Sequence, residues 1–323
     1  MLDPQTRALL DGPLKPSSGT PSVEAARRAN IALGRALGGR LEPVSTVETH
    51  HLLVGEQPDS HSIAVRVYRP STATSLPGLV YCHGGGWVSG TLDSYDALSR
   101  ALAVACGAVV AVVDYRLAPE HPYPAALDDV TAAVHWMFRH AQDLGCDPHR
   151  IGIAGDSAGG NLAAVTALRL RSEANRPGRH QPHAPNLAAQ LLLYPILDAT
   201  MSSASYCELA DGYYLTTNLV RWYWQNYLAE ADDLDKRSPD VSPRYATDLV
   251  DLPDTLILSC GYDPLKDEAQ AYADQLERAG TKVCRLRYPE TIHGFLRFRG
   301  PLDVARTAAL GIGTFVHQAL ATV

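Results

Sequence analysis

The chain has 323 residues, of which 46% are hydrophobic and 20% are charged, and its formal net charge is −7. This composition is typical of a globular protein, without a bias towards disorder, and the length is ordinary for one α/β domain. The net negative charge and the lack of any run of Lys or Arg argue against nucleic acid as a partner.

The N-terminal segment, residues 1–45, is predicted to be helical, with breaks at Pro, Gly and Ser residues. Ser22 is suited to cap the helix that follows it. Four charged residues interrupt the first fifteen positions. We therefore expect neither a signal peptide nor a transmembrane span, and we expect a cytoplasmic location.

After two short strand-like runs, apolar strands alternate with segments of helical length. The strands are predicted at 78–83, 108–115, 151–155, 187–195, 255–260 and 281–289. The helices are predicted at 94–105, 124–143, 158–172, 265–279 and 302–320. Strands that are apolar almost throughout indicate a mainly parallel sheet covered by helices on both faces. Catalytic groups on such a sheet are expected in loops at the carboxyl ends of the strands.

Segment 198–250 does not follow this alternation. Thr217 is placed to cap a helix with one wide apolar stripe, formed by Val220, Tyr223, Trp224, Tyr227 and Leu228. We interpret the segment as an insertion over the sheet, and we expect most of the stripe to dock it onto the core. Tyr213 and Tyr214 precede the helix in a Gly-containing loop, where we expect them to bind the substrate.

The predicted organisation is therefore a core built from two stretches, 46–197 and 251–323. Residues 1–45 supply N-terminal cap helices, and residues 198–250 supply a cap insertion.

The motif at 155–159, Gly-Asp-Ser-Ala-Gly, lies between a predicted strand and a predicted helix. A sharp turn there requires small flanking residues, which Gly155 and Gly159 supply. Ser157 then projects from the turn as the candidate nucleophile, above the N–H groups of the helix start.

A second motif, His-Gly-Gly-Gly-Trp at 83–87, directly follows a strand. Three successive glycines leave N–H groups uncovered, and acyl transfer needs such donors for the oxygen that gains negative charge. We expect Gly84, Gly85 and Ala158 to form this oxyanion hole. His83 is interpreted as an organiser of the loop and not as a base.

Chain order points to the two partners of the serine, because in this context an acid and then a His follow the nucleophile. Asp263 comes just after a strand, whereas Asp267 and Glu268 lie in the next helix and are interpreted as charges of its first turn. His293 follows the last strand in a short loop, and His317 falls in the terminal helix. We therefore expect His293 to act as base and Asp263 to orient it.

No metal or cofactor is expected. The sequence contains no HExxH or comparable ligand cluster, and its six cysteines include no CxxC pair. We interpret these cysteines as free thiols that pack as small hydrophobic side chains.

On the motifs HGGGW, DYRLAPEHPYPAALDD, GDSAGGNLA, DPLKDE and IHGF, the chain resembles the bacterial hormone-sensitive-lipase-like esterases of the GDSAG subgroup. The resemblance runs from about residue 60 to the C-terminus. It implies an α/β-hydrolase fold with a helical cap, and a carboxylesterase for small-molecule esters with short to medium acyl chains, without a cofactor. It also implies a homodimer formed through the last strand, and supporting roles for Asp156 and Glu120.

Two alternatives stay open. The same triad serves equally for a lactone, an amide or an acetylated natural product, because fold and triad do not specify the acyl partner. A ligand-binding receptor without catalysis is the other alternative, and the presence of His293 argues against it.

Overall fold

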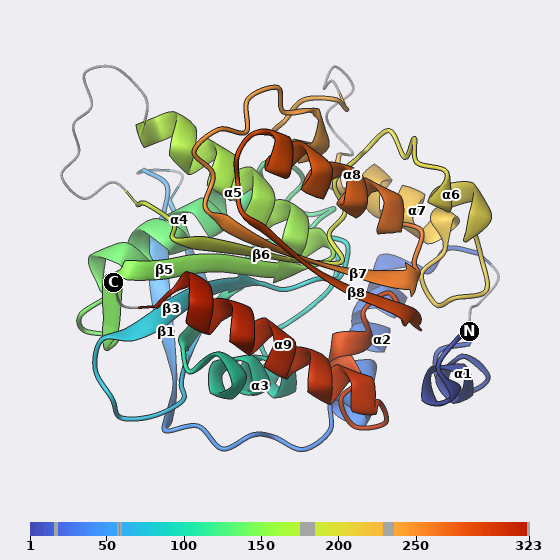
Figure 1. Ribbon diagram of the computed structural model, residues 1–323, viewed down its shortest axis with the longest axis horizontal. Coiled ribbons are helices and arrows are strands. Elements are labelled where there is room, and N and C mark those ends of the chain that lie inside the picture. The colour runs from blue at the N-terminus through green and yellow to red at the C-terminus, as the bar shows by residue number, and fades with distance from the viewer. Residues whose placement is uncertain (16–18, 57, 59, 175–184, 229–235, 322–323) are drawn as a thin grey trace.

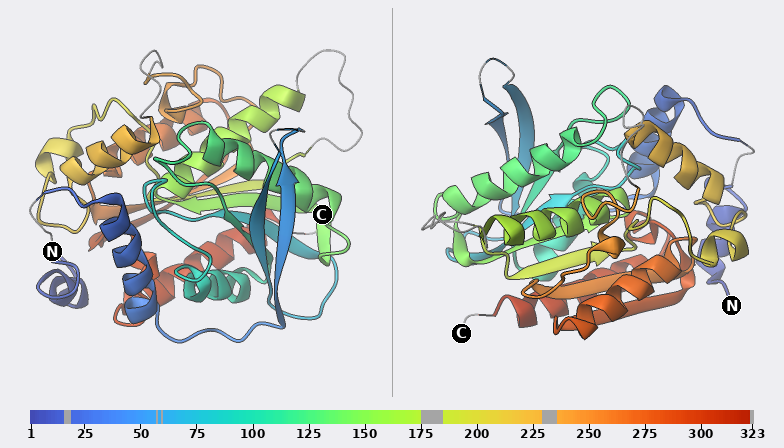
Figure 2. Two further views of the ribbon diagram at one scale, coloured as in Figure 1. Left: turned by 180° about the vertical axis from the view of Figure 1, so that it is seen from behind. Right: turned by 90° about the horizontal axis from the view of Figure 1, so that it is seen from above.

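The computed structural model describes residues 1–323 except 16–18, 57, 59, 175–184, 229–235 and 322–323. In the described part of the chain, eight strands form one sheet in the order β1-β2-β4-β3-β5-β6-β7-β8. The strands are β1 Thr46–Val54, β2 His61–Arg69, β3 Leu76–Cys82, β4 Val109–Asp114, β5 Cys146–Asp156, β6 Ala189–Leu193, β7 Asp254–Tyr262 and β8 Val283–Ile292. The strands from β4 to β8 in this order run parallel, and β1 and β2 add an antiparallel edge (Figure 2).

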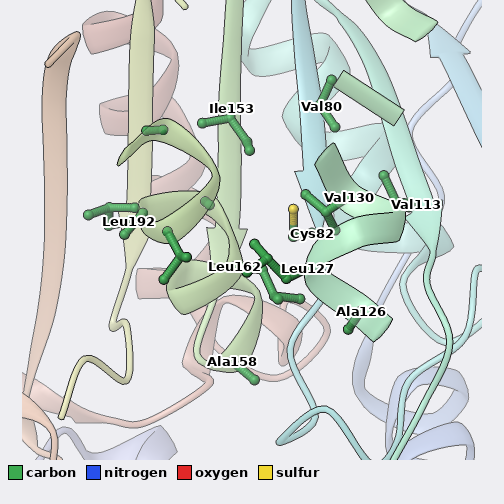
Figure 3. Close-up of a cluster of buried hydrophobic side chains, with 14 of the residues drawn as sticks. Val80, Cys82, Val113, Ala126, Leu127, Val130, Ile153, Ala158, Leu162 and Leu192 are labelled. Carbon is green, nitrogen blue, oxygen red and sulfur yellow. The ribbon is translucent and has the colours of Figure 1, made fainter. Parts of the chain in front are cut away.

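Helices cover both faces of the sheet, as the apolar strands predict. The main ones are α3 Asp96–Cys106, α4 Ala125–Arg139, α5 Ala158–Ala174, α8 Lys266–Arg278 and α9 Asp303–Ala319. Helices α4, α5 and α8 lie on one face, and α3 and α9 on the other (Figure 1). Figure 3 shows Leu127 of α4 and Leu162 of α5 packed on the side of the sheet that carries Val80 and Ile153. These contacts bury both faces and confirm the predicted architecture.

The remaining helices gather at the end of the sheet to which the parallel strands point (Figure 1). They are α1 Pro4–Leu10, α2 Val23–Leu37, α6 Ser205–Glu208 and α7 Thr217–Tyr227. Ser22 caps α2 as expected, accepting a hydrogen bond from the N–H of Ala25 at 3.2 Å. The predicted cap of α7 is wrong by one residue, because Thr216 and not Thr217 accepts from the N–H of Leu219.

Two sets of contacts hold α2 and α7 against the core. Arg27 of α2 donates to the carbonyl oxygens of Val88 and Ala118 and forms an ion pair with Glu120. The ring of Tyr227 from α7 stacks on Trp87, with centroids 4.2 Å apart and the planes nearly parallel. Both contacts meet the loops that follow β3 and β4, so they position the helices over the carboxyl ends of the strands.

The structure also bears on the expected free thiols and on the expected lack of a transmembrane helix. All six cysteines are free thiols, and four of them are buried. None of the helices in the described ranges combines the length and the apolarity that crossing a bilayer requires.

Candidate active site

Ser157 lies in the sharp turn between β5 and α5, and its backbone has a φ of 57°, in the left-handed region. The turn brings main-chain atoms very close to the two flanking glycines. A Cβ on Gly155 would overlap the carbonyl of Gly159, and one on Gly159 would overlap the carbonyl of Cys82. The motif therefore contains glycine where no side chain fits, and the turn presents the Ser157 hydroxyl to the cavity that it lines.

His293 and Asp263 meet Ser157 at the carboxyl ends of neighbouring strands. His293 follows β8, and its Nε2 lies 2.9 Å from Oγ of Ser157. Its Nδ1 lies 2.8 Å from Oδ2 of Asp263, which follows β7. The exposed fractions of Asp263 and His293 are 1% and 5%. The structure thus brings together the three residues that chain order singled out.

This arrangement defines what each atom can do. The Asp263 carboxylate accepts from the N–H of Leu265 at 2.9 Å through Oδ1, which leaves Oδ2 aimed at His293. With its Nδ1–H donated to Asp263, the imidazole presents a bare Nε2 to the serine hydroxyl. Such an imidazole can take the proton of Ser157 while its oxygen attacks an electrophilic carbon.

The oxyanion prediction needs one correction, at Gly84. The N–H of Gly84 donates to Oδ1 of Asp156 at 2.8 Å, so it does not point at a substrate. Gly85 and Gly86 line the cavity, and among the described residues no hydrogen-bond partner is seen for either N–H group. Ala158 begins α5, where N–H groups have no partner within the helix. The geometry thus favours Gly86 in place of Gly84, a residue that the run of three glycines already contained.

Asp156 fixes the glycine loop to the serine turn. Besides Gly84, its carboxylate accepts from the hydroxyls of Tyr81 at 2.9 Å and Tyr95 at 3.0 Å. Burial raises the pKa of Asp156, against the opposing effect of Arg297 and of these three donors. The residue therefore positions the loop, which agrees with the supporting role implied by the resemblance.

His83 is fully buried beneath the same loop. Its Nδ1–H donates to the carbonyl of Gly84 at 2.9 Å, and its ring stacks on Tyr115 with centroids 4.3 Å apart. Its Nε2 has no hydrogen-bond partner among the described residues. His83 therefore organises the loop, as the sequence suggests, and does so as a neutral imidazole.

A pH dependence of stability follows. Burial lowers the pKa of His83 from its ordinary value of 6.5 to about 4. Between these values the unfolded chain binds a proton that the native protein does not, so native stability falls as the pH drops. Going from pH 7 to pH 4.5, His83 should account for a loss of about 2 kcal/mol in the free energy of unfolding.

Denaturant unfolding at both pH values measures this loss in the wild type and in His83→Gln. The acid-induced loss should be smaller in the variant by about that amount, whatever the variant's own stability. Equal losses in the two proteins would show that His83 is already protonated in the native state at pH 4.5.

A cavity of about 280 Å³ opens above Ser157. Tyr214 lines it, with its ring edge-on to Phe298 at 5.6 Å between centroids. Tyr213 does not line it, because its ring packs on Tyr262 at 4.9 Å instead. The substrate-binding prediction is therefore wrong for Tyr213.

The side chains of the predicted apolar stripe on α7 do not all have the same role. Tyr223 lines the cavity, and most of the others pack into the core.

Glu268 has a structural role that the sequence did not indicate. It lies in the first turn of α8 as expected, but it is fully buried. Its carboxylate accepts from the N–H of Leu197 at 2.7 Å and from the hydroxyl of Tyr206 at 3.0 Å. Burial raises the pKa of Glu268 well above its usual range. The residue ties the start of the insertion to the helix that follows Asp263.

Comparisons with known proteins agree with this fold. A family model described as the α/β-hydrolase fold matches residues 79–297. The chain is 43% identical over 236 residues to the carboxylic ester hydrolase LipN of Mycobacterium tuberculosis, covering 72% of this chain but only 61% of LipN. It is 42% identical over 238 residues to the carboxylesterase NlhH of the same species, covering 73% of this chain and 72% of NlhH.

A solved structure agrees over the whole length. The hyperthermophilic esterase of the archaeon Pyrobaculum calidifontis superposes with a TM-score of 0.88 at 36% identity, and the match covers 99% of each chain. The sheet, both layers of helices and the helices over the carboxyl ends of the strands all fall within the matched length.

Proposed function

Because the chain belongs to the α/β-hydrolase fold family, and within it to the esterases that resemble hormone-sensitive lipase, we propose that it hydrolyses carboxylic esters. The observation that supports this most directly is the unbroken chain of hydrogen bonds from Asp263 through His293 to Ser157. The finer assignment to the GDSAG subgroup stays a prediction from the motif.

In the proposed reaction, Ser157 Oγ attacks the ester carbonyl while His293 Nε2 takes its proton. The C–O bond to the alcohol then breaks, and His293 returns the proton to the leaving alkoxide. His293 next takes a proton from water, whose oxygen attacks the acyl carbon. The bond to Ser157 Oγ then breaks, the acid leaves, and His293 returns the proton to Oγ. Asp263 keeps the imidazole in the required tautomer and stabilises its protonated form.

We assign the developing oxyanion to the N–H groups of Gly85, Gly86 and Ala158. Two of these groups come from the loop that Asp156 anchors, and the third comes from the start of α5. Donors held in place before the reaction cost no reorganisation when the charge forms.

We further propose that α1, α2 and segment 198–250 act as a cap over the cavity. The predicted homodimer and the predicted cytoplasmic location stay predictions. A screen of esters that differ in acyl length and leaving group, with lactones and anilides beside them, tests the reaction class. Hydrolysis of anilides but not of esters would contradict the proposal.

The size of the cavity yields a prediction on chain length. Each methylene buried against an apolar wall contributes about 0.8 kcal/mol, so kcat/KM should rise with acyl length until the cavity is full. For a cavity of about 280 Å³ we expect this optimum at short to medium chains. Tyr214→Ala removes a ring from the lining and should move the optimum to longer acyl chains.

Tyr213→Ala is the matched control, because Tyr213 packs on Tyr262 outside the cavity. A series of p-nitrophenyl esters from acetate to dodecanoate measures the profile of each protein. Tyr213→Ala should keep the wild-type optimum, and an unchanged optimum in Tyr214→Ala would show that Tyr214 does not bound the acyl chain.

A further inference from the structure

Arg297 places a buried positive charge in the wall of the active-site cavity. It lies four residues after His293, in the short 3-10 helix η2 Phe295–Arg297, and only 8% of its surface is exposed. Its side chain lines the same cavity as Ser157 and His293. The loop that supplies the candidate base therefore also brings in a guanidinium, which stays charged at all working pH values.

The contacts of Arg297 leave much of its donor capacity unused. Its Nη2 donates to the backbone oxygen of Asn30 at 3.2 Å and to Oδ1 of the same residue at 3.1 Å. Its Nε has no hydrogen-bond partner within the described ranges. The guanidinium carbon lies 4.4 Å from the centre of the Tyr95 ring, which is a cation–π contact and not an ion pair.

Two other arginines, one buried and one half-buried, are neutralised by a carboxylate. Arg299, two residues on and 7% exposed, pairs with Glu42 at 2.8 Å. Arg116 pairs with the fully buried Asp129 at 2.9 Å. For Arg297, no carboxylate of the described residues lies within the 4 Å of an ion pair. Asp156 offsets part of this charge from a distance, but no carboxylate in the described part of the chain contacts the guanidinium. A buried cation without a contacting carboxylate is costly for the fold, which makes Arg297 a candidate to bind an anionic ligand.

The other charges around the cavity do not meet this need. Asp156 is the acidic residue of the described lining, and its oxygens are taken by Gly84, Tyr81 and Tyr95. Lys15 adds a second cation at the exposed rim. The described lining therefore offers cationic donors to a ligand but no free carboxylate.

We propose that Arg297 binds a carboxylate carried by the ester substrate, separate from the ester bond that is cleaved. This inference rests on the proposed ester hydrolysis and names its substrate class: monoesters of dicarboxylic acids, or acyl esters of hydroxy acids. A guanidinium suits this ligand because its planar donors match the two oxygens of a carboxylate. Bound in this way, the carboxylate also supplies the contacting counter-ion that Arg297 lacks.

Two pairs of substrates test the inference and separate the two sources of the carboxylate. Methyl hydrogen glutarate and its neutral amide, methyl glutaramate, differ in charge on the acyl side. The pair 2-acetoxypropanoate and 2-acetoxypropanamide differs in charge on the alcohol side. At pH 7.5 each acid is ionised, so the ratio of kcat/KM within a pair reports recognition of the carboxylate.

In the wild type we expect a ratio above one in at least one pair. Arg297→Gln should lower that ratio about tenfold to a hundredfold, the range expected for losing a hydrogen bond to a charged group. Arg297→Lys keeps the charge, so its ratio should lie between those of Arg297→Gln and the wild type. Arg299→Gln removes a buried arginine outside the cavity, and its ratio should equal that of the wild type.

Binding to Ser157→Ala gives a readout that does not depend on turnover. Calorimetry should detect tighter binding of the acid than of the amide in the preferred pair, and the difference should disappear in the double variant with Arg297→Gln. Equal loss on acid and amide in Arg297→Gln would overturn the inference, because it would reveal a purely structural arginine. Hydrolysis of neutral esters with no preference in either pair would also overturn it, while leaving ester hydrolysis itself intact.

Discussion

Ser157→Ala is expected to lower kcat for ester hydrolysis by a factor on the order of 10⁶. The substitution removes the oxygen that lies 2.9 Å from Nε2 of His293, and no other hydroxyl occupies that position. The fold should persist, because the lost atom lies at the cavity and supports no other element. Hydrolysis of p-nitrophenyl butyrate by the purified variant measures the loss, and its unfolding curve checks the fold.

Labelling gives a second test of the same assignment. A fluorophosphonate should modify the wild type at Ser157 and leave the variant unmodified. Labelling at another serine, together with activity that survives in Ser157→Ala, would contradict the proposed nucleophile.

Asp263→Asn is the second large effect, with an expected fall in kcat of about 10⁴, the value found for the equivalent change in a serine protease. Asn fills the same space, but its amide N–H can donate to Nδ1 of His293. The imidazole then carries its proton on Nε2 and has no free electron pair for Ser157. Steady-state kinetics on one ester give the ratio directly.

Asp267→Asn is the matched control for this prediction. Asp267 lies four residues further along, where it pairs with Lys266 in the first turn of α8. Its replacement should change kcat by far less than that of Asp263. A larger loss for Asp267→Asn would assign the orienting carboxylate to α8 and not to the end of β7.

The sequence was sufficient to predict the fold and the three central residues, for identifiable reasons. Each of Ser157, Asp263 and His293 directly follows a strand or begins the loop after one. Parallel strands place their carboxyl ends at one edge, so residues far apart in the chain meet there. The strands are apolar almost throughout because helices cover both faces, which makes them easy to recognise.

Finer assignments failed where the role of a residue depends on the direction in which its N–H group or its side chain points. The sequence presents three equivalent glycines, and only the position of the Asp156 carboxylate decides that the N–H of Gly84 is occupied. Tyr213 and Tyr214 are likewise the same type of residue, so the sequence does not distinguish their roles. Tyr214 has a φ of 71°, a backbone conformation that sequence patterns do not reveal in a tyrosine.

Arg297 was missed for a different reason. Its hydrogen-bond partner, Asn30, lies 267 positions earlier in the chain. No local pattern links the two residues, and a charged residue after a histidine motif most simply reads as a surface residue.

The cavity wall joins residues of α2 to residues around η2, and this has a consequence for protein synthesis. The stretch that bears Asn30 is made well before His293 and Arg297, since Arg297 lies 267 positions further along the chain. A chain stalled just before residue 293 already contains Ser157, but it lacks both the base and the wall residues around η2. Such a chain is expected to resist fluorophosphonate labelling until translation resumes, so the active site forms only after His293 has been made.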